Sequence, residues 1–147
     1  MEDLKFDGAF NYKTTTTQAF LASNVPGGVD IYFDNVGGET LDQTLGHMKL
    51  NGRIIGCGSI SQYDTPEKDR YGVKNLFYIV TKRLKFEGFI ISDLLSKYPD
   101  AVTQLATWVK EGSLKSRETI YNGLEKVPEA FLGLFVGANT GKAVILV

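Results

Sequence analysis

The stretch GVDIYFDNVGGETLD, residues 28–42, ends a hydrophobic run abruptly in two polar side chains. Asn35 can hydrogen-bond a ligand, whereas Asp34 can cap the helix that follows. Gly37 and Gly38 let backbone or ligand approach without a Cβ atom in the way. Parallel α/β sheets bind ligands in loops of this kind, at the carboxyl ends of their strands. A plain Asn-Val-Gly-Gly turn is the alternative, and on this stretch alone both interpretations stay open.

The numbers of cysteine and histidine residues limit the metal and thiol chemistry that this chain can perform. Cys57 is the only cysteine and His47 the only histidine among the 147 residues. One of each cannot build the usual zinc site of four cysteine and histidine ligands, so we expect a chain without metal. No internal disulfide is possible, which is typical of a reducing compartment such as the cytoplasm. Since no base lies next to Cys57 in the sequence, we interpret it as a small buried residue rather than a nucleophile.

The composition excludes two classes of partner. The formal net charge of −1 gives no electrostatic reason to expect nucleic acid. No uncharged hydrophobic run reaches the roughly 20 residues that a membrane span needs. The first residues, MEDLKFDG, lack the hydrophobic centre of a secretory signal. We therefore expect a cytoplasmic protein that contacts neither membranes nor nucleic acid.

The elements that position these residues alternate along the chain. Short hydrophobic runs, which predict strands, lie at 28–33, 52–58, 85–91 and 142–147. Amphipathic segments between them predict helices, and the four threonines at 14–17 predict a helix N-cap. Alternating strands and helices indicate an α/β fold with a parallel sheet that is covered on both faces.

Two segments break this alternation. Residues 118–147 lack the pattern of a clean strand–helix–strand unit, and we interpret them as part of a second domain. Residues 9–12 predict a short strand after the end of a helix. A doubly wound nucleotide domain should open with a strand and the sequence G-x-G-x-x-G, which appears nowhere in these residues.

Five stretches together are similar to one protein family: FNYK (10–13), FDNVGGE (33–39), GRIIGCGSISQY (52–63), FEGFIISD (86–93) and GANTGKAV (137–144). They resemble the carboxyl-side half of a medium-chain dehydrogenase/reductase, of the zinc-free branch of prostaglandin reductases, leukotriene dehydrogenases and double-bond reductases. The resemblance implies the later half of a doubly wound, Rossmann-type sheet plus a closing segment. It divides the chain into 1–117, a partial nucleotide-binding domain lacking the glycine-rich loop, and 118–147, the closing segment of the catalytic domain.

The resemblance also implies a reaction. Members of this branch use NADPH to reduce the C=C bond of α,β-unsaturated ketones or aldehydes, and the cofactor carries the hydride chemistry. We expect this activity of the parent enzyme and expect this chain alone to be inactive. Two alternatives stay open. One is a quinone reductase of the same superfamily, and the other is a truncated, non-catalytic chain that retains only an assembly surface.

The site residues follow from the same resemblance. The amide of Asn35 would contact NADP(H), and the loop from Cys57 to Tyr63 would lie along the nicotinamide ribose. Tyr63 would also be catalytic, because a phenol near the reacting carbonyl can donate a hydrogen bond to the enolate oxygen. The expected cofactor-binding residues are Tyr12, Asn35, Cys57, Gly58, Ser59, Ile60, Ser61, Gln62, Tyr63, Phe89, Ile90, Ile91 and Asn139.

Simpler interpretations exist for some of these positions. Ile90 and Ile91 can be packing residues, and Asn139 can be a turn residue with a left-handed backbone. The strand from Phe86 to Ile91 resembles the edge strand through which relatives join two sheets. Because an unpaired hydrophobic edge must be covered or paired, we expect a homodimer through this strand.

Overall fold

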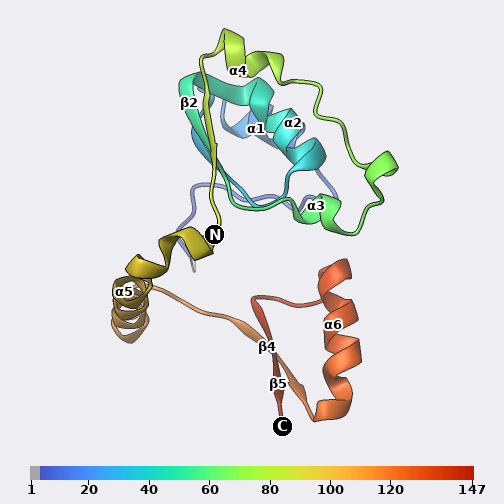
Figure 1. Cartoon of the computed structure of the whole chain (residues 1–147), viewed down its shortest axis with the longest axis vertical. Helices are drawn as coiled ribbons and strands as arrows, with labels where there is room; N and C mark the ends of the chain where they lie inside the picture. The colour runs from blue at the N-terminus through green and yellow to red at the C-terminus, as the bar shows by residue number, and fades with distance from the viewer. Residues whose placement is uncertain (1–3) are drawn as a thin grey trace. The chain divides into compact units, whose positions relative to one another are not determined.

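The computed structural model describes residues 4–147 (Figure 1). The chain folds as two compact units, Met1–Leu95 and Ser96–Val147, and each is described by itself. The division after residue 117 that the sequence suggests concerns the domains of a longer protein, and it stays a prediction.

The first unit contains a three-stranded parallel sheet with the order β1-β2-β3. Its strands are β1 (Val29–Asp34), β2 (Met48–Gly56) and β3 (Lys85–Gly88). The α/β class and the parallel sheet that the sequence predicted are confirmed. Strand β3 is shorter than the predicted run, because the chain turns after Phe89 into a 3₁₀ segment, η2 (Ile91–Lys97).

Helix α1 (Thr17–Asn24) precedes β1. The segments that connect the strands contain α2 (Gly38–His47), α3 (Ile60–Tyr63), η1 (Glu67–Asp69) and α4 (Phe77–Thr81). The predicted threonine cap is confirmed, since the Thr16 hydroxyl accepts a hydrogen bond from the Ala19 N–H at 3.1 Å. Helix α1 is tied to α2, where the side-chain oxygen of Gln43 accepts the N–H of Gln18. Helix α4 is short, because the chain turns at Arg83, whose φ of 50° is left-handed.

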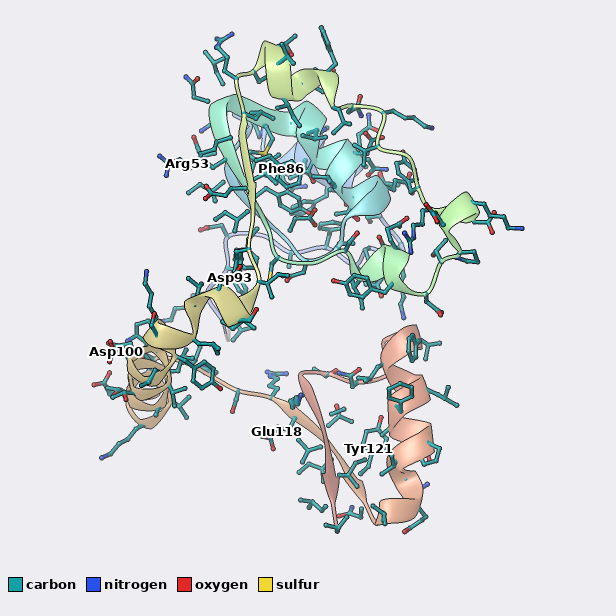
Figure 2. All side chains as sticks on the ribbon, viewed as in Figure 1. Arg53, Phe86, Asp93, Asp100, Glu118 and Tyr121 are labelled. Carbon is teal, nitrogen blue, oxygen red and sulfur yellow. The ribbon has the colours of Figure 1, made fainter. Side chains whose placement is uncertain are left out.

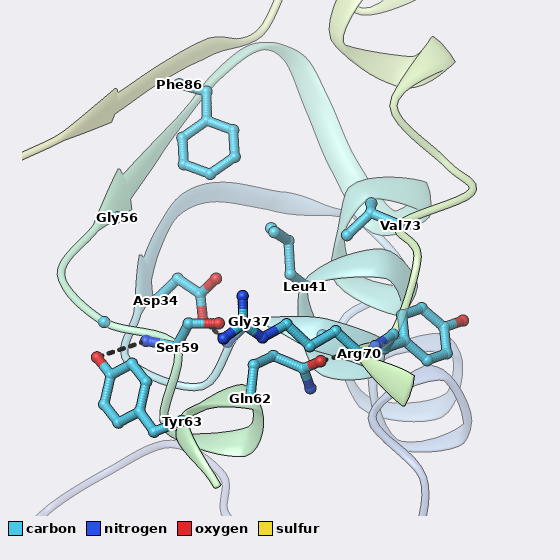
Figure 3. Close-up of a pocket in the computed structure, with 13 residues that line it drawn as sticks. Asp34, Gly37, Leu41, Gly56, Ser59, Gln62, Tyr63, Arg70, Val73 and Phe86 are labelled. Atoms are coloured by element: carbon cyan, nitrogen blue, oxygen red, sulfur yellow. Dashed lines mark hydrogen bonds between the residues drawn. The ribbon is translucent and has the colours of Figure 1, made fainter. Parts of the chain in front are cut away.

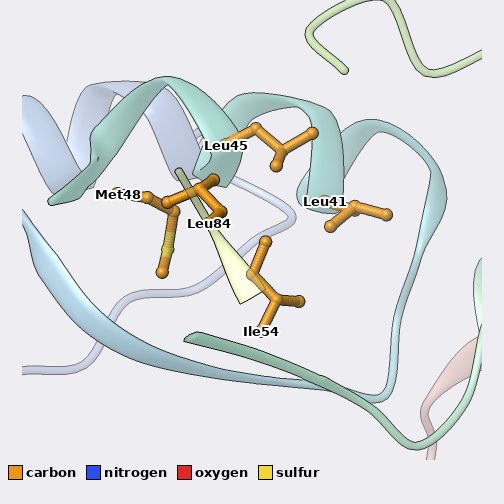
Figure 4. Close-up of a cluster of buried hydrophobic side chains, with 5 residues drawn as sticks. All are labelled: Leu41, Leu45, Met48, Ile54 and Leu84. Atoms are coloured by element: carbon orange, nitrogen blue, oxygen red, sulfur yellow. The ribbon is translucent and has the colours of Figure 1, made fainter. Parts of the chain in front are cut away.

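The core of this unit lies between α2 and one face of the sheet (Figure 4). Its buried members are Leu41, Leu45, Met48, Ile54 and Leu84. On β1, Tyr32 packs against this core, whereas its neighbours Ile31 and Phe33 point the other way and are 61% and 51% exposed. The second face of the sheet is thus hydrophobic and exposed, so the expectation of a sheet covered on both faces is wrong for this unit.

Strand β3 forms one edge of the sheet, next to β2. The N–H of Phe89, just after the strand, donates to the carbonyl oxygen of Gly56 at 3.1 Å. All four residues of β3 are exposed, and Figure 2 shows Phe86 on this strand and Arg53 on β2. Within residues 4–147 no other strand pairs with the outer side of β3.

The second unit holds α5 (Tyr98–Lys110), β4 (Glu118–Asn122), η3 (Leu124–Lys126), α6 (Val127–Val136) and β5 (Lys142–Leu146). Strands β4 and β5 pair in parallel with α6 between them in sequence. The expectation that residues 118–147 are not a strand–helix–strand unit is therefore wrong. The strand ETIYN alternates exposed and half-buried side chains, so it lacked the continuous hydrophobic run by which the other strands were recognised.

Two smaller features complete the fold. The short strand expected at 9–12 is also wrong, because the carbonyl oxygen of Asn11 accepts the N–H groups of Thr14 and Thr15 and closes a turn there. The helix expected before it lies partly outside the described residues. Across the described part of the chain, none of the helices combines the length and the hydrophobicity needed to cross a bilayer.

Candidate nucleotide-binding crevice

The site begins at Asp34, the last residue of β1. Its side chain is 2% exposed, and its Oδ1 atom accepts three hydrogen bonds. They come from the N–H groups of Val36 and Gly37, both at 2.9 Å, and from the Tyr32 hydroxyl at 2.7 Å. Burial, reinforced by this carboxylate, raises the pKa of Tyr32, so the phenol keeps its proton. Asp34 thus fixes the turn that leads from β1 into α2.

The loops after β1 and β2 are joined by a ladder of backbone hydrogen bonds. The carbonyl oxygen of Asp34 accepts the N–H groups of Cys57 and Gly58 at 2.8 and 3.0 Å. The carbonyl oxygen of Asn35 then accepts Ile60 N–H at 3.0 Å. Val36 continues the series, because its carbonyl oxygen accepts both the N–H and the hydroxyl of Ser61. Two loops that are separate in sequence therefore form one surface at the carboxyl ends of β1 and β2.

The two glycines of the first loop allow this close approach. Gly37 has a φ of 65°, and a Cβ atom there would lie 2.0 Å from the Ser59 hydroxyl. Gly38 has a φ of 53°, and its Cβ atom would lie 2.5 Å from Nε2 of Gln62. Both positions therefore need glycine, for the backbone conformation and for the space that the second loop occupies.

Tyr63 folds back over its own loop. Its hydroxyl oxygen accepts the N–H of Ser59 at 2.9 Å, and the side chain is 65% exposed (Figure 3). A Cβ atom on Gly58 would lie 2.9 Å from this hydroxyl. A phenol oxygen that accepts one hydrogen bond still has its own O–H to donate, so Tyr63 can serve an oxygen atom of a ligand.

A first cavity of ≈470 Å³, here called the crevice cavity, opens at the ends of β2 and β3. Its walls include Cys57, Gly58, Ser59, Tyr63, Phe89 and Ile90, all of them expected cofactor-binding residues. The interpretation of Cys57 as buried is wrong: the residue is exposed, because it follows the last residue of β2, beyond the carboxyl end of the strand. Phe89 and Ile90 provide hydrophobic surface beside a few polar groups, and such a lining can bind a ligand with a flat ring that carries an amide.

A second cavity of ≈560 Å³, here called the wall cavity, lies between the start of α2 and the segment Arg70–Val73 (Figure 3). It shares Gly58, Ser59 and Tyr63 with the crevice cavity. Gln62 also lines it, and Arg70 extends across it in the close-up. The loop from Ser59 to Tyr63 thus separates two hollows and contributes side chains to both.

The remaining expected site residues lie differently. Asn35 joins the ladder through its backbone, but its side chain is exposed and lines neither cavity. Ile60 and Ser61 belong to the ladder, and Ile91 begins η2 directly after Ile90. Tyr12, which is 72% exposed, lies in the turn at the start of the first unit, within 6.0 Å of Lys13 Nζ.

Asn139 belongs to the second unit. Its side-chain amide donates to the carbonyl oxygen of Gly141 at 2.6 Å, and Gly141 has a left-handed φ of 74°. This contact is typical of a turn asparagine. The left-handed backbone expected for Asn139 is wrong, because its φ is not positive. A cofactor contact of Asn139 stays a prediction.

Sequence reasoning missed the residues that support the site from behind. Asp34 was noted only as a helix cap, and Asp42, Arg70 and Tyr71 were not singled out. Asp42 on α2 is 4% exposed, and it accepts hydrogen bonds from the segment that walls the second cavity. A charged residue at a position of the helix stripe that faces inward was the available signal, because a buried carboxylate requires partners.

The donor set does not fit zinc. Cys57 follows β2 and His47 ends α2, and within residues 4–147 no group of three or more His, Cys, Asp or Glu side chains could hold a metal ion. A zinc site needs four such ligands, or three with water, so no chemical step is assigned to zinc here.

Comparison with known proteins finds a matching family model and relatives that are named reductases. A family model described as zinc-binding dehydrogenase matches residues 4–145. The NADP(+)-dependent 2-alkenal reductase of Nicotiana tabacum is 46% identical over 97% of this chain and 41% of its own length. The (+)-pulegone reductase of Mentha piperita is 40% identical over the same shares. The chain thus spans about two fifths of these relatives.

Among solved structures, CurA from Vibrio vulnificus in complex with NADPH has a similar fold, with a TM-score of 0.82 and 33% identity. The match covers 99% of this chain and 46% of CurA. An NAD-dependent alcohol dehydrogenase at 21% identity has a TM-score of 0.72, which indicates a shared fold alone.

Proposed function

Since this chain belongs to the zinc-binding dehydrogenase family, within the medium-chain dehydrogenase/reductase superfamily, we propose that it forms part of an NADPH-dependent reductase. The reaction is reduction of the C=C bond of an α,β-unsaturated ketone or aldehyde. The proposal rests on relatives whose names state this chemistry, 2-alkenal reductase and pulegone reductase.

One observation of the structure supports the proposal most strongly. The loops after β1 and β2 are joined residue by residue, from Asp34–Cys57 to Val36–Ser61, at the carboxyl ends of a parallel sheet. This is the edge at which such sheets bind nucleotides. A turn that only connected β1 with α2 would not need the carbonyl oxygens of three successive residues, Asp34 to Val36, to accept hydrogen bonds from another loop.

We assign NADP(H) to this edge. The ring of the nicotinamide would contact the crevice cavity, where Phe89 and Ile90 provide hydrophobic surface and Cys57 and Ser59 provide polar atoms. The exposed amide of Asn35 has no hydrogen-bond partner among the described residues, so it is available to a ligand. Tyr12, Ile91 and Asn139 complete the set as proposed contacts.

When bound, the cofactor supplies the hydride that reaches the β-carbon of the substrate. Negative charge then develops on the substrate oxygen, and the α-carbon takes a proton to complete the reduction. Tyr63 can donate its O–H to that oxygen while its own oxygen accepts the Ser59 N–H. The Ser59 N–H thereby holds the phenol in place and makes it a better donor.

Three further properties belong to this proposal. The enzyme works without zinc, a proposal supported by the described residues, whose His, Cys, Asp and Glu side chains form no group that could hold a metal ion. It is a homodimer in which the outer side of β3 and the residues up to Ile91 pair with a second copy. It is cytoplasmic, which suits an exposed free thiol at Cys57.

Two alternatives give different results in a simple experiment. A quinone reductase would bind NADPH and pass its hydride to a quinone but not to an enone. A non-catalytic chain that retained only an assembly surface would self-associate without binding NADPH. Titration of the chain with NADPH tests the non-catalytic alternative. Addition of 2-cyclohexen-1-one or a benzoquinone to a longer, active protein that contains this segment separates the enone reductase from the quinone reductase. We expect weak binding and no turnover by this chain alone, because no glycine-rich loop provides backbone N–H groups for the pyrophosphate. Sub-micromolar binding would contradict this expectation.

A further inference from the structure

Asp42 lies on α2, one turn beyond the start of the helix, and its side chain is buried beneath the segment Arg70–Asn75. One carboxylate oxygen, Oδ1, accepts the N–H groups of Lys74 and Asn75 at 2.9 and 2.7 Å. The other, Oδ2, accepts the hydroxyl of Tyr71 at 2.8 Å. The side-chain amide of Asn75 returns a hydrogen bond to the Asp42 carbonyl oxygen at 3.1 Å.

These four hydrogen bonds fix a segment that has little other structure. Residues 70–76 form neither helix nor strand, and Val73 is the hydrophobic member that packs against the core. Asp42 therefore supplies most of the polar anchoring for the segment that closes one side of the wall cavity. Hydrogen bonds to a carboxylate are about twice as strong as those between neutral groups, which suits an anchor of a loop.

The anchored segment is connected in turn to the proposed cofactor loop. The N–H of Tyr71 donates to Oε1 of Gln62 at 2.7 Å, and Nε2 of Gln62 lies 2.9 Å from the Ser61 hydroxyl oxygen. The Ser61 hydroxyl donates to the Val36 carbonyl oxygen at 2.6 Å. A continuous path of hydrogen bonds thus runs from Asp42 through Tyr71 and Gln62 to the two joined loops.

We propose that Asp42 is a positioning residue, which holds the segment Arg70–Asn75 and, through Gln62, sets the position of the Ser59–Tyr63 loop. The part that concerns ligand binding rests on the proposed function. Asp42 touches neither cavity itself, so it acts only through the residues it anchors. The segment is then a fixed wall of the site rather than a mobile flap.

The first arm of the test needs no ligand. Hydrogen exchange followed by NMR is compared in the wild type, in Asp42→Ala and in Asp42→Asn. In Asp42→Ala the amides of Lys74, Asn75 and Tyr71 should exchange about ten- to a hundredfold faster. The Ser61 amide should accelerate about threefold or more, because its supporting Gln62 loses a fixed partner. Trypsin should cut faster after Lys68 and Arg70.

Asp42→Asn should restore much of the protection at Lys74 and Asn75, because the amide oxygen can still accept both N–H groups. Asp30→Ala is the matched control: it also removes one carboxylate, but that group pairs with Lys49 on the surface, away from the segment. The control should leave all these rates unchanged. Equal acceleration of the amides of β1 and β2 in Asp42→Ala would mean a general loss of stability and would overturn a positioning role. Unchanged rates at Lys74 and Asn75 would overturn it as well.

The second arm measures NADPH affinity in variants that remain folded. Asp42→Ala should raise the Kd by about five- to tenfold, and Gln62→Ala should do the same without exposing Lys74 and Asn75 to exchange. If Asp42→Ala loosens the segment and the Kd is unchanged, the link through Gln62 is wrong. If the wild type binds no NADPH at about 10 mM, the proposed function fails, and the exchange rates of Ser61 and Lys74 alone decide the role of Asp42.

Discussion

Oδ1 of Asp34 lies 2.9 Å from the backbone nitrogen of Gly37, and the carbonyl oxygen of the same aspartate lies 2.8 Å from the backbone nitrogen of Cys57. One residue at the end of β1 therefore fixes both loops of the crevice. Its side chain holds the turn into α2, and its backbone carbonyl oxygen accepts hydrogen bonds from the start of the loop after β2.

Replacing Asp34 by alanine should destabilise the protein by about 3 kcal/mol, because two buried N–H groups and the Tyr32 hydroxyl lose a charged acceptor. Denaturation by urea measures this difference. Asp30→Ala is the control, since its exposed pair with Lys49 should contribute less than about 1 kcal/mol. Equal losses in the two variants would show that Asp34 is no more than a surface charge.

A methyl group at Gly37 should separate the two loops. An alanine side chain there would require a backbone conformation reserved for glycine and would overlap the Ser59 hydroxyl, so Gly37→Ala should cost about 2–3 kcal/mol. Gly72→Ala is the matched control, because nothing lies within 4 Å of its added Cβ atom and its φ is not left-handed. Thermal unfolding of both variants gives the comparison. A Gly37→Ala protein as stable as Gly72→Ala would contradict the close packing of the loops.

Local patterns in the sequence predicted the parallel sheet and the polar loop at the carboxyl end of β1. The run VDIYFD ends at Asp34 as a strand should, and the threonines at 14–17 include the N-cap of α1, Thr16. Such features depend on residues close together in the chain, so a window of the sequence contains them.

What could not be predicted depends on distant pairs. Asp42 and Asn75 are 33 residues apart, and no local pattern indicates that a carboxylate on α2 anchors a later loop. The exposure of Cys57 depends on where β2 stops in the sheet. The strand ETIYN was missed because its partner, β5, is 24 residues further along and only the pairing makes it a strand.

Asp42 should also make the folding stability of the protein depend on pH in the acidic range. Burial alone would raise the pKa of Asp42, but hydrogen bonds from Asn75 N–H, the Tyr71 hydroxyl and Lys74 N–H outweigh it and lower the pKa below its ordinary value. A lowered pKa in the folded state gives stability that is present above the unfolded pKa and is lost as pH falls through the folded one. Asp42→Asn should therefore lose less stability than the wild type between about pH 4 and pH 2, roughly the range of carboxyl titration. Parallel curves for the two proteins would mean that Asp42 does not titrate in this way.

The edge strand should control association. Because Phe89 N–H donates inward to Gly56, the N–H of Gly88 faces the outer edge by alternation. Gly88→Pro should thus remove an outer donor, keep the β2–β3 ladder and favour the monomer. Gly88→Ala keeps the N–H and should remain dimeric in sedimentation velocity. A wild-type chain that sediments as a monomer at micromolar concentration would contradict dimerisation through β3.

The role of Tyr63 requires a protein in which this segment is joined to a glycine-rich loop and an amino-terminal catalytic domain. There Tyr63→Phe removes only the hydroxyl, and kcat for an enone should fall by about ten- to a hundredfold while NADPH binding changes little. Tyr98→Phe, which removes another exposed hydroxyl from the second unit, should leave kcat unchanged. If kcat of Tyr63→Phe is unchanged and hydride transfer limits the rate, Tyr63 is not the donor to the substrate oxygen.

The central claim is that the joined loops after β1 and β2 bind NADP(H), and an NMR titration of the labelled chain with NADPH tests it most directly. Millimolar NADPH should shift the amide signals of residues 35–38 and 57–63 and of Phe89 and Ile90, while the signals of α1 and of the start of β2 stay in place. Weak affinity is expected, and the location of the shifts is decisive. Shifts confined to other parts of the chain, or none at saturating NADPH, would contradict the claim.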